Sequence, residues 1–326
     1  MSEYSLKSDI KFDSVCKKAG EMLSSAYHNG KIFASLPKPD GSLSEFEILS
    51  VLALAKSCRK KIINQYIESG KIFNVTTSGI LAWVIINIFN DLSDNEKGRI
   101  ERYFTNVEEY FDKRTGTDGL LSAGQADNWI KSVKRKGFLI EFQAYYAKII
   151  DLLFLLTEDD MYEFKKKRLL RAVRKNLDVA FVLDREDSLE VRSNIFIAAF
   201  FAPELFKRDV WQVTFDTSLK KEELWLSWGG LRILGRSDIN YNDAKDGESW
   251  FFVNNMSALA LARSDRVKYQ KYIDMVLKSS TCNIMWQEHS GRPCEVTLTS
   301  SGQIKVQGLY GLSLATFIYL YMFLNN

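Results

Sequence analysis

The sequence contains few of the residues that mark secreted, metal-binding or loosely linked proteins. Its 326 residues include four prolines, four cysteines and two histidines. No Pro/Gly/Ser-rich stretch divides the chain, so we expect a single domain over residues 1–326. The cysteines show no CxxC spacing, and with so few histidines a zinc site is not expected. The sequence therefore predicts no metal and no cofactor.

Charge is balanced, which excludes further classes of protein. Lys and Arg number 44 against 41 Asp and Glu, a net charge of +3. This balance argues against a nucleic-acid partner or a membrane surface. Two short basic runs, KKKR at 165–168 and KSVKRK at 131–136, are interpreted as solvated helix faces or loop edges. The first residues, MSEYSLKSDI, lack the pattern of a signal peptide, so we expect a cytoplasmic protein. Nothing in the sequence indicates its oligomeric state.

One long apolar run lies near the C-terminal end of the sequence. GLYGLSLATFIYLYMFL, residues 308–324, is slightly shorter than the roughly 20 residues needed to span a bilayer, and it lacks basic flanks. The run is instead typical of an inner helix in a layered all-α protein, apolar on every side.

Helical periodicity dominates the rest of the chain. The spacings Ser44-x-x-Glu47 and Ser93-x-x-Glu96 are capping boxes, and Thr157-x-x-Asp160 is a weaker version. Ser264 is predicted to cap a further helix. The predicted helices span residues 9–28, 44–68, 78–92, 94–112, 138–156, 158–177, 187–200, 206–219, 249–263, 265–279 and 308–325.

Helices of these lengths with short breaks are typical of stacked helical hairpins. No fixed-period repeat is present, which argues against solenoids of identical units. Strand periodicity is confined to CEVTLTSSGQIKVQ, residues 294–307, which predicts a β-hairpin. Two architectures remain: an all-α (α/α)6 toroid and an irregular helical solenoid. Long loops bearing Trp and Gly, at 116–137, 225–250 and 281–307, follow alternate helices and would meet at one end of a toroid. We therefore predict the toroid.

These loops carry residues suited to a sugar site. Glycoside hydrolysis needs one carboxylic acid that protonates the leaving oxygen and a second carboxylate that acts as base or nucleophile. Aromatic faces are needed for sugar rings to stack on. The first loop carries Asp127, Trp129 and Lys131, the third carries Glu288, and the second carries Arg232 and Trp250.

The order of several segments resembles the glucosidase domain of glycogen debranching enzymes (amylo-alpha-1,6-glucosidase type) and their six-hairpin relatives. The family segments Asp-Gly-Leu-Leu, Thr-Trp-Met-Asp and Val-Glu-x-x-Ala-Leu-Trp-Tyr are similar to DGLL at 118–121, NWIK at 128–131 and IEFQAYY at 140–146. Gly-Leu-Arg-Ser-Leu, Gly-x-x-Trp and Arg-Pro-Asn are similar to GLRIL at 230–234, GESW at 247–250 and RSN at 192–194. The resemblance covers roughly residues 116–325. It implies an (α/α)6 fold and a glycoside hydrolase acting on an α-glucan or related oligosaccharide.

The same resemblance implies roles for individual residues. The family's catalytic base falls on Glu288, and the position of its general acid is occupied by Lys131. A lysine, with a reference pKa of about 10.4, is a poor proton donor at neutral pH. Asp127 lies in Gly124-Gln125-Ala126-Asp127-Asn128, similar to the acid-bearing loop of other six-hairpin glycosidases, and is the candidate acid. The candidate substrate-binding residues are Trp129, Lys131, Glu141, Arg232, Trp250 and Gln307, although Arg232 could instead pair with Asp238.

Alternatives therefore stay open from the sequence. Asp127 could be the acid of an inverting enzyme, or the acid could be lost and the scaffold could bind carbohydrate without turnover. Lys131, as a compact cation, would also suit an enzyme for anionic sugars. A helical interaction scaffold without a small-molecule site is a further possibility from a different class. A saccharide substrate is the partner that the sequence favours.

Overall fold

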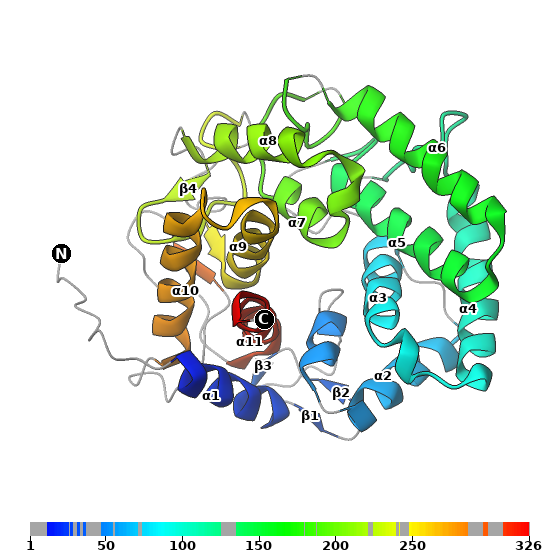
Figure 1. The fold of residues 1–326 in the computed structure, drawn as a ribbon, viewed down its shortest axis with the longest axis horizontal. Helices are drawn as coiled ribbons and strands as arrows, with labels where there is room; N and C mark the ends of the chain where they lie inside the picture. Colours follow the sequence, from blue (N-terminus) through cyan, green and yellow to red (C-terminus); the bar gives the residue numbers. More distant parts are fainter. Residues whose placement is uncertain are drawn as a thin grey trace.

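Two concentric rings of helices surround one axis in the computed structural model (Figure 1). The structure describes residues 12–25, 27–28, 31–32, 35–36, 47–54, 56–70, 74–124, 135–178, 180–186, 188–220, 224–238, 241, 248–285, 296–298 and 309–325. The chain alternates between an inner and an outer helix, so the inner helices all run in the same direction. The architecture is the predicted all-α (α/α)6 toroid.

The inner ring is formed by five α-helices and one 3-10 helix. They are η1 (Glu47–Ala53), α3 (Val75–Asn87), α5 (Ile140–Thr157), α7 (Asn194–Phe201), α9 (Phe251–Asp265) and α11 (Gly311–Asn325). Each packs on the next in this order, and α11 packs on η1, which closes the ring. Every residue of α7 is buried, and nearly every residue of α9 is, because these helices are covered on both sides. This environment explains why their sequences are apolar without a helical stripe.

The outer ring consists of α1 (Phe12–Ser25), α2 (Lys56–Glu68), α4 (Asp94–Asp112), α6 (Asp160–Leu177), α8 (Arg208–Lys220) and α10 (Gln270–Met285). These helices are amphipathic, with one buried stripe and one solvent-exposed face. The capping box predicted at the start of α4 is present, since Ser93 and Glu96 bond each other's backbone N–H groups. The start of α6 differs from the prediction, because Asp159 rather than Thr157 caps it.

Aromatic side chains fill the middle of the inner ring. Trp83 of α3 lies 5.3 Å from Phe200 of α7 and 6.3 Å from Tyr319 of α11, measured between ring centroids. Tyr145 of α5 lies 5.2 Å from Phe201. Four inner helices therefore contact each other through one aromatic cluster, and the interior at this level is packed.

Short β-pairings join the connections that precede the inner helices. Strand β6 (Glu248–Trp250) pairs with β7 (Val296–Leu298), and β3 (Ser35–Leu36) pairs with β8 (Leu309–Tyr310). Two further pairs are β1 (Tyr27–His28) with β2 (Lys31–Ile32) and β4 (Trp225–Leu226) with β5 (Gly230–Leu231). Two short 3-10 helices, η2 (Phe89–Asp91) and η4 (Pro203–Leu205), complete the described elements.

The predicted helices correspond to the observed ones, with three corrections. The helix predicted over 187–200 begins only at Asn194, because Ser188 and Arg192 form β-bridges in the connection before it. The segment predicted as one helix over 44–68 is divided into η1 on the inner ring and α2 on the outer ring. Ser264 does not cap a helix but lies buried inside α9, and the next helix begins at Gln270. The predicted strand at 296–298 is present and pairs with β6, while residues 299–308 lie outside the described residues. In the described part of the chain, no helix has the length and apolarity to cross a bilayer.

Candidate active site at the N-terminal end of the inner ring

The three loops singled out from the sequence end at one end of the toroid. They lead into α5, α9 and α11, which all belong to the inner ring and begin at the same end. The segments just before the inner helices are joined there by β-pairings. Leu139 forms a bridge with Arg185, Arg192 forms one with Leu234, and β6 pairs with β7. These pairings link the connections before α5, α7, α9 and α11 in a continuous belt. The belt lies at the end of the toroid at which these loops can meet.

Within the first loop (116–137), backbone bonds join Ala123 to Gly137, on either side of the segment that carries the candidate acid. The two bonds have N–O distances of 2.8 and 3.2 Å and form the base of that segment. Gln143, in the first turns of α5, supports this base from inside. Its Nε2 donates to the carbonyl of Leu121 at 2.8 Å, and its Oε1 accepts from the Leu121 N–H at 3.0 Å. The segment that carries Asp127, Trp129 and Lys131 therefore begins and ends at fixed points beside the start of α5.

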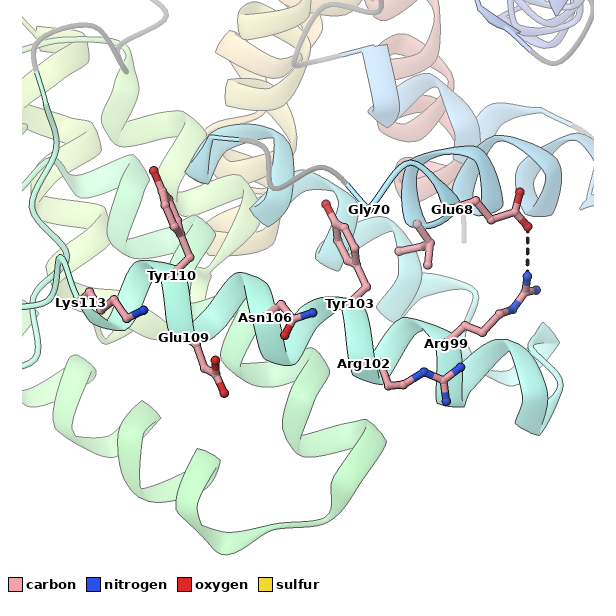
Figure 2. Close-up of a pocket in the computed structure, with 10 residues that line it drawn as sticks. Glu68, Gly70, Arg99, Arg102, Tyr103, Asn106, Glu109, Tyr110 and Lys113 are labelled. Carbon is pink, nitrogen blue, oxygen red and sulfur yellow. Dashed lines mark hydrogen bonds and ion pairs between the residues drawn. The ribbon is translucent and has the colours of Figure 1, made fainter.

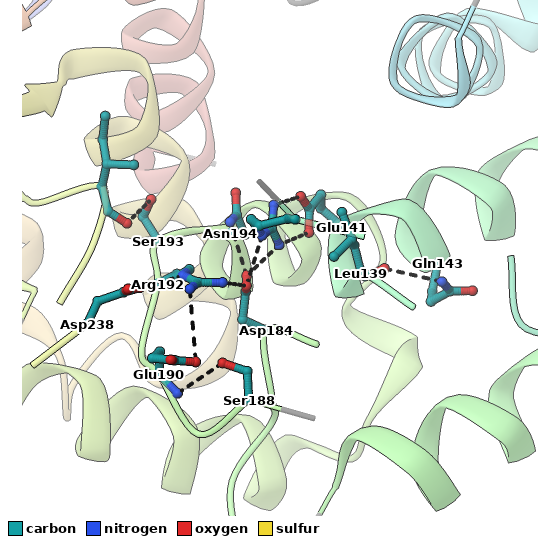
Figure 3. Close-up of polar contacts among 12 residues, drawn as sticks. Leu139, Glu141, Gln143, Asp184, Ser188, Glu190, Arg192, Ser193, Asn194 and Asp238 are labelled. Atoms are coloured by element: carbon teal, nitrogen blue, oxygen red, sulfur yellow. Dashed lines mark hydrogen bonds and ion pairs between the residues drawn. The ribbon is translucent and has the colours of Figure 1, made fainter. Parts of the chain in front are cut away.

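A buried ionic network centred on Asp184 joins the three connections that precede α5, α7 and α9 (Figure 3). The Asp184 carboxylate accepts from Arg135 Nη2 at 2.6 Å, from Arg192 Nη1 at 2.8 Å and from Asn194 Nδ2 at 3.0 Å. Arg135 belongs to the loop before α5 and is the first described residue after position 124. Asp184 lies between α6 and α7, and Arg192 and Asn194 lie at the start of α7. The network thus fixes the loop before α5 against the start of α7.

Each arginine of this network also contacts a second carboxylate. The fork of Arg135 contacts Glu141 with Nη1 at 2.5 Å and Nη2 at 2.9 Å. Arg192 Nε donates to Asp238 at 2.7 Å. The first pair is bidentate and the second is a single charge-assisted bond, and together with the bonds to Asp184 they hold each planar guanidinium in one orientation. Asp238 belongs to the second loop (225–250), so this loop is anchored to the same network as the first.

The network has no solvent contact at its centre. The side chains of Arg135, Glu141 and Asp184 are 0% exposed. Burial alone would lower the pKa of Arg135, but the charges of Asp184 and Glu141 outweigh it and raise that pKa. Burial raises the pKa of Glu141, against the lowering effect of Arg135. Two arginines face three buried carboxylates here, those of Glu141, Asp184 and Asp238, and this excess of acids agrees with the raised pKa of Glu141.

Three of the predicted site residues lie in the described structure, all at this end of the toroid. Glu141 occupies the first turn of α5 and bonds Arg135 through both oxygens. Arg232 is buried, bridges Ser249 and donates through Nη1 to the carbonyl of Trp225 at 3.5 Å. Trp250 is half-buried at the start of α9, with its ring 5.7 Å from Phe252. The remaining predictions, Asp127, Trp129, Lys131, Glu288 and Gln307, fall outside the described residues.

Two members of the network were not identified from the sequence. Arg135 belongs to the basic run at 131–136 that was interpreted as a solvated edge, and this interpretation is wrong for Arg135 because its side chain is fully buried. Asp184 stands in an unremarkable stretch between two helices. The motif Arg192-Ser193-Asn194 was the usable signal, since its first and third residues both bond Asp184.

Metal ligands and paired thiols are not features of the described residues. Over that part of the chain, no cluster of three or more His, Cys, Asp or Glu side chains could hold a metal ion. Cys16, Cys58 and Cys282 are free thiols. Burial raises the pKa of the Cys282 thiol.

Comparison with known proteins shows a shared fold without recognisable sequence similarity. No family model matches this sequence, and no curated protein matches it. The chain is similar in structure to a GH63 mannosylglycerate hydrolase from Thermus thermophilus, with a TM-score of 0.69 and 13% identity over 95% of this chain and 100% of that one. It is also similar to a glycosidase (0.70, 11%, 96% of both chains) and to a D-mannose isomerase (0.67, 14%, 100% of both chains). The chain shares their fold. This agrees with the six-hairpin, glycosidase-like architecture expected from the sequence.

Proposed function

We propose that this protein is a carbohydrate-active enzyme, a glycoside hydrolase whose site lies at the N-terminal end of the inner ring. The observation that carries the proposal is the convergence of three loops on that end. The loop that carries the candidate acid Asp127 and the loop that carries Arg232 and Trp250 are both anchored to the network around Asp184. The fold shared with a mannosylglycerate hydrolase and a glycosidase supports the same class of reaction.

In the proposed mechanism two carboxyl groups act on opposite sides of the glycosidic bond. Glu288 removes a proton from water, and the resulting nucleophile attacks the anomeric carbon with inversion. Asp127 gives its proton to the leaving oxygen, so the bond breaks without releasing a free alkoxide. An inverting enzyme needs its carboxyl groups roughly 6.5–9.5 Å apart to admit that water.

The remaining candidates hold the sugar. Trp129 and Trp250 would stack on sugar faces, and Arg232, Lys131 and Gln307 would contact hydroxyl groups. Glu141 is proposed to act through Arg135, because its two oxygens are engaged by that guanidinium. An α-glucan or related oligosaccharide, including the α-1,6 linkage of debranching enzymes, is the proposed substrate. A single domain over residues 1–326 and a cytoplasmic location remain predictions.

A second candidate is hydrolysis of an anionic sugar, with Lys131 holding the charge. The mannosylglycerate hydrolase of similar fold has been solved with D-glycerate, which bears a carboxylate. The compact ammonium group of Lys131, at the position of the family's acid, would suit the carboxylate of an anionic sugar. The proposed reaction centre is the same, and only the sugar differs.

The test is sugar release from α-1,4- and α-1,6-linked oligosaccharides, uronate-containing oligosaccharides and mannosylglycerate, with conversion of D-mannose as a separate assay. Wild type is compared with Glu288→Gln and Asp127→Asn, and Glu158→Gln on the α5–α6 turn is the control variant. We expect wild-type turnover that both site variants reduce by at least about a hundredfold, and proton NMR of the first product to show inversion.

Each other result has a definite meaning. Turnover that survives both substitutions would mean that these are not the catalytic carboxylates. Saccharide binding without turnover would identify a binding protein on the same scaffold. Conversion of D-mannose without hydrolysis would replace the hydrolase by an isomerase.

A further inference from the structure

A polar groove lies on the outer wall of the toroid, along α4 (Figure 2). Its volume is about 570 Å³, within the roughly 300–1,000 Å³ of small-molecule sites. The end of α2 forms one wall through Ile67, Glu68 and Gly70, and α4 supplies the rest between residues 99 and 113. This stretch of α4 is about 21 Å long at 1.5 Å per residue. The groove is distinct from the inner helix ends that hold the candidate active site.

The groove exists because α2 ends before α4 does. Lys60 contacts Glu96 at 3.1 Å and Glu68 contacts Arg99 at 3.0 Å, so the two helices run side by side over the first part of α4. α2 stops at Glu68, whereas α4 continues to Asp112. The outer face of the last turns of α4 is therefore not covered by α2.

The side chains of this face combine donors, an acceptor and an exposed aromatic ring. Arg102, Asn106, Glu109 and Lys113 make no side-chain hydrogen bond or ion pair to other described residues. Tyr110 is 47% exposed. They recur at spacings of three and four residues, which places them on one side of the helix. Tyr103, which is buried, lies between them and the end of α2.

We propose that this groove binds a segment of an oligosaccharide. Sugar hydroxyl groups both donate and accept, so they match a surface where Arg102 and Lys113 donate, Glu109 accepts and Asn106 does both. The exposed ring of Tyr110 offers a face for a sugar ring. Arg99 is paired with Glu68. The remaining charged side chains of the groove are two cations, Arg102 and Lys113, and one carboxylate, Glu109. That balance, with Glu109 among the cations, disfavours a phosphate-binding site.

The groove leads toward the candidate active site. Lys113 at its end is followed by residues 114–124, which run to the base of the loop that carries Asp127. A polymeric chain held along α4 would therefore be held near the rim where the proposed hydrolysis takes place. The choice of an oligosaccharide rests in part on the proposed function, but binding in the groove requires no turnover.

The experiment is calorimetric titration of the full chain carrying Glu288→Gln, so that bound sugar is not cleaved. The probes are a linear α-1,4-linked glucose heptasaccharide, an α-1,6-linked one and a uronate-containing oligosaccharide of similar length. Tyr110→Ala and Asn106→Ala are introduced separately. The control is Phe323→Ala, which removes an aromatic ring that is 40% exposed. Phe323 lies at the C-terminal end of α11, outside the groove. Circular dichroism checks that each variant is folded.

We expect each groove substitution to weaken binding of at least one probe by about fivefold or more, while Phe323→Ala leaves it unchanged. Turnover of a disaccharide, too short to reach the groove, is expected to be the same in Tyr110→Ala as in wild type. Equal affinity of all probes for the groove variants and their parent would overturn the proposal. Tyr110-dependent binding in a protein without hydrolase activity would retain the groove and reject only the proposed function.

Discussion

Arg135 and Glu141 face each other as a two-pronged ion pair inside the toroid, with Nη1–Oε1 and Nη2–Oε2 distances of 2.5 and 2.9 Å. The arginine also bonds Asp184, and neither partner has exposed surface. The pair therefore connects the last part of the first loop (116–137) to the first turn of α5. A carboxylate in the first turn is also favoured by the positive end of the helix dipole.

Replacing Arg135 by methionine is expected to destabilise the protein strongly. Glu141 loses its bidentate ion pair with Arg135, and Asp184 loses one of its two arginine partners. The network then keeps three buried carboxylates with a single cation, Arg192. Breaking a buried pair by removing one partner costs about 3–5 kcal/mol. Urea unfolding of wild type and variant measures this difference. Lys167→Met is the matched control: its partner is Glu163, both side chains are about half exposed, and the expected cost is about 0–1 kcal/mol. A cost for Arg135→Met no larger than the control's would contradict the assigned role.

The helical architecture could be predicted because it depends on local pattern. The capping box at Ser93 and Glu96 predicted the start of α4 from four consecutive residues, and the structure contains this capping box. The apolar run at 308–324 predicted an inner helix, and α11 is one. The prediction of one helix over 44–68 was wrong. This segment has continuous helical periodicity without glycine or proline, so its sequence does not indicate the break between η1 and α2.

The candidate site could be predicted only in part, because its chemistry depends on contacts between distant residues. Arg135 reads as part of a basic run, and only the fold brings Asp184, 49 residues later, to its guanidinium. Glu141 and Gln143 are two residues apart in α5 and bond different partners, Arg135 and the backbone of Leu121. Ser264 has the residue type of a cap, but burial inside α9 overrides that preference.

Gly79 is expected to tolerate no side chain. A Cβ at this position of α3 would lie 2.3 Å from Tyr145 Cβ and 2.6 Å from its Cα, so α3 and α5 approach each other through this glycine. Gly79→Ala should destabilise by about 1–3 kcal/mol or more through overpacking. Gly98→Ala is the control, since no atom lies within 4 Å of its added Cβ, and alanine at that helical site should stabilise by about 0.5–1 kcal/mol. Thermal unfolding of both variants tests the pair, and shifts of the same sign would refute this account of the α3–α5 contact.

Glu96 is expected to make stability depend on pH in the acid range. The hydrogen bond from the Ser93 backbone is the largest cause that lowers the pKa of Glu96, assisted by Lys60. A folded-state pKa below the unfolded value of about 4.3 gives stability that is present above that value and is lost as pH falls through the folded pKa. Wild type should therefore exceed Glu96→Gln in stability at neutral pH, and the difference should shrink on acidification. Urea midpoints at a series of pH values measure it, and a difference that grows toward low pH would have the wrong sign.

Gln143 is expected to hold the base of the candidate acid loop from inside α5. Its side chain bonds both backbone groups of Leu121, and a second bond from Nε2 reaches the carbonyl of Leu139 at 3.2 Å. Gln143→Leu keeps the volume but leaves the buried N–H and carbonyl of Leu121 without these partners, at about 1–3 kcal/mol each. The Leu139 carbonyl keeps its bonds from the backbone N–H groups of Phe142 and Gln143. Asn87→Ala, which removes an exposed bond to the preceding helical turn, is the control, and we expect a change within about 0.5 kcal/mol. Hydrogen exchange followed by mass spectrometry should show faster exchange at residues 120–124 in Gln143→Leu, beyond what the global loss of stability accounts for. Because the amide of Leu121 is the group that Gln143 protects, unchanged exchange there would mean that the loop base is held by Ala123 and Gly137 alone.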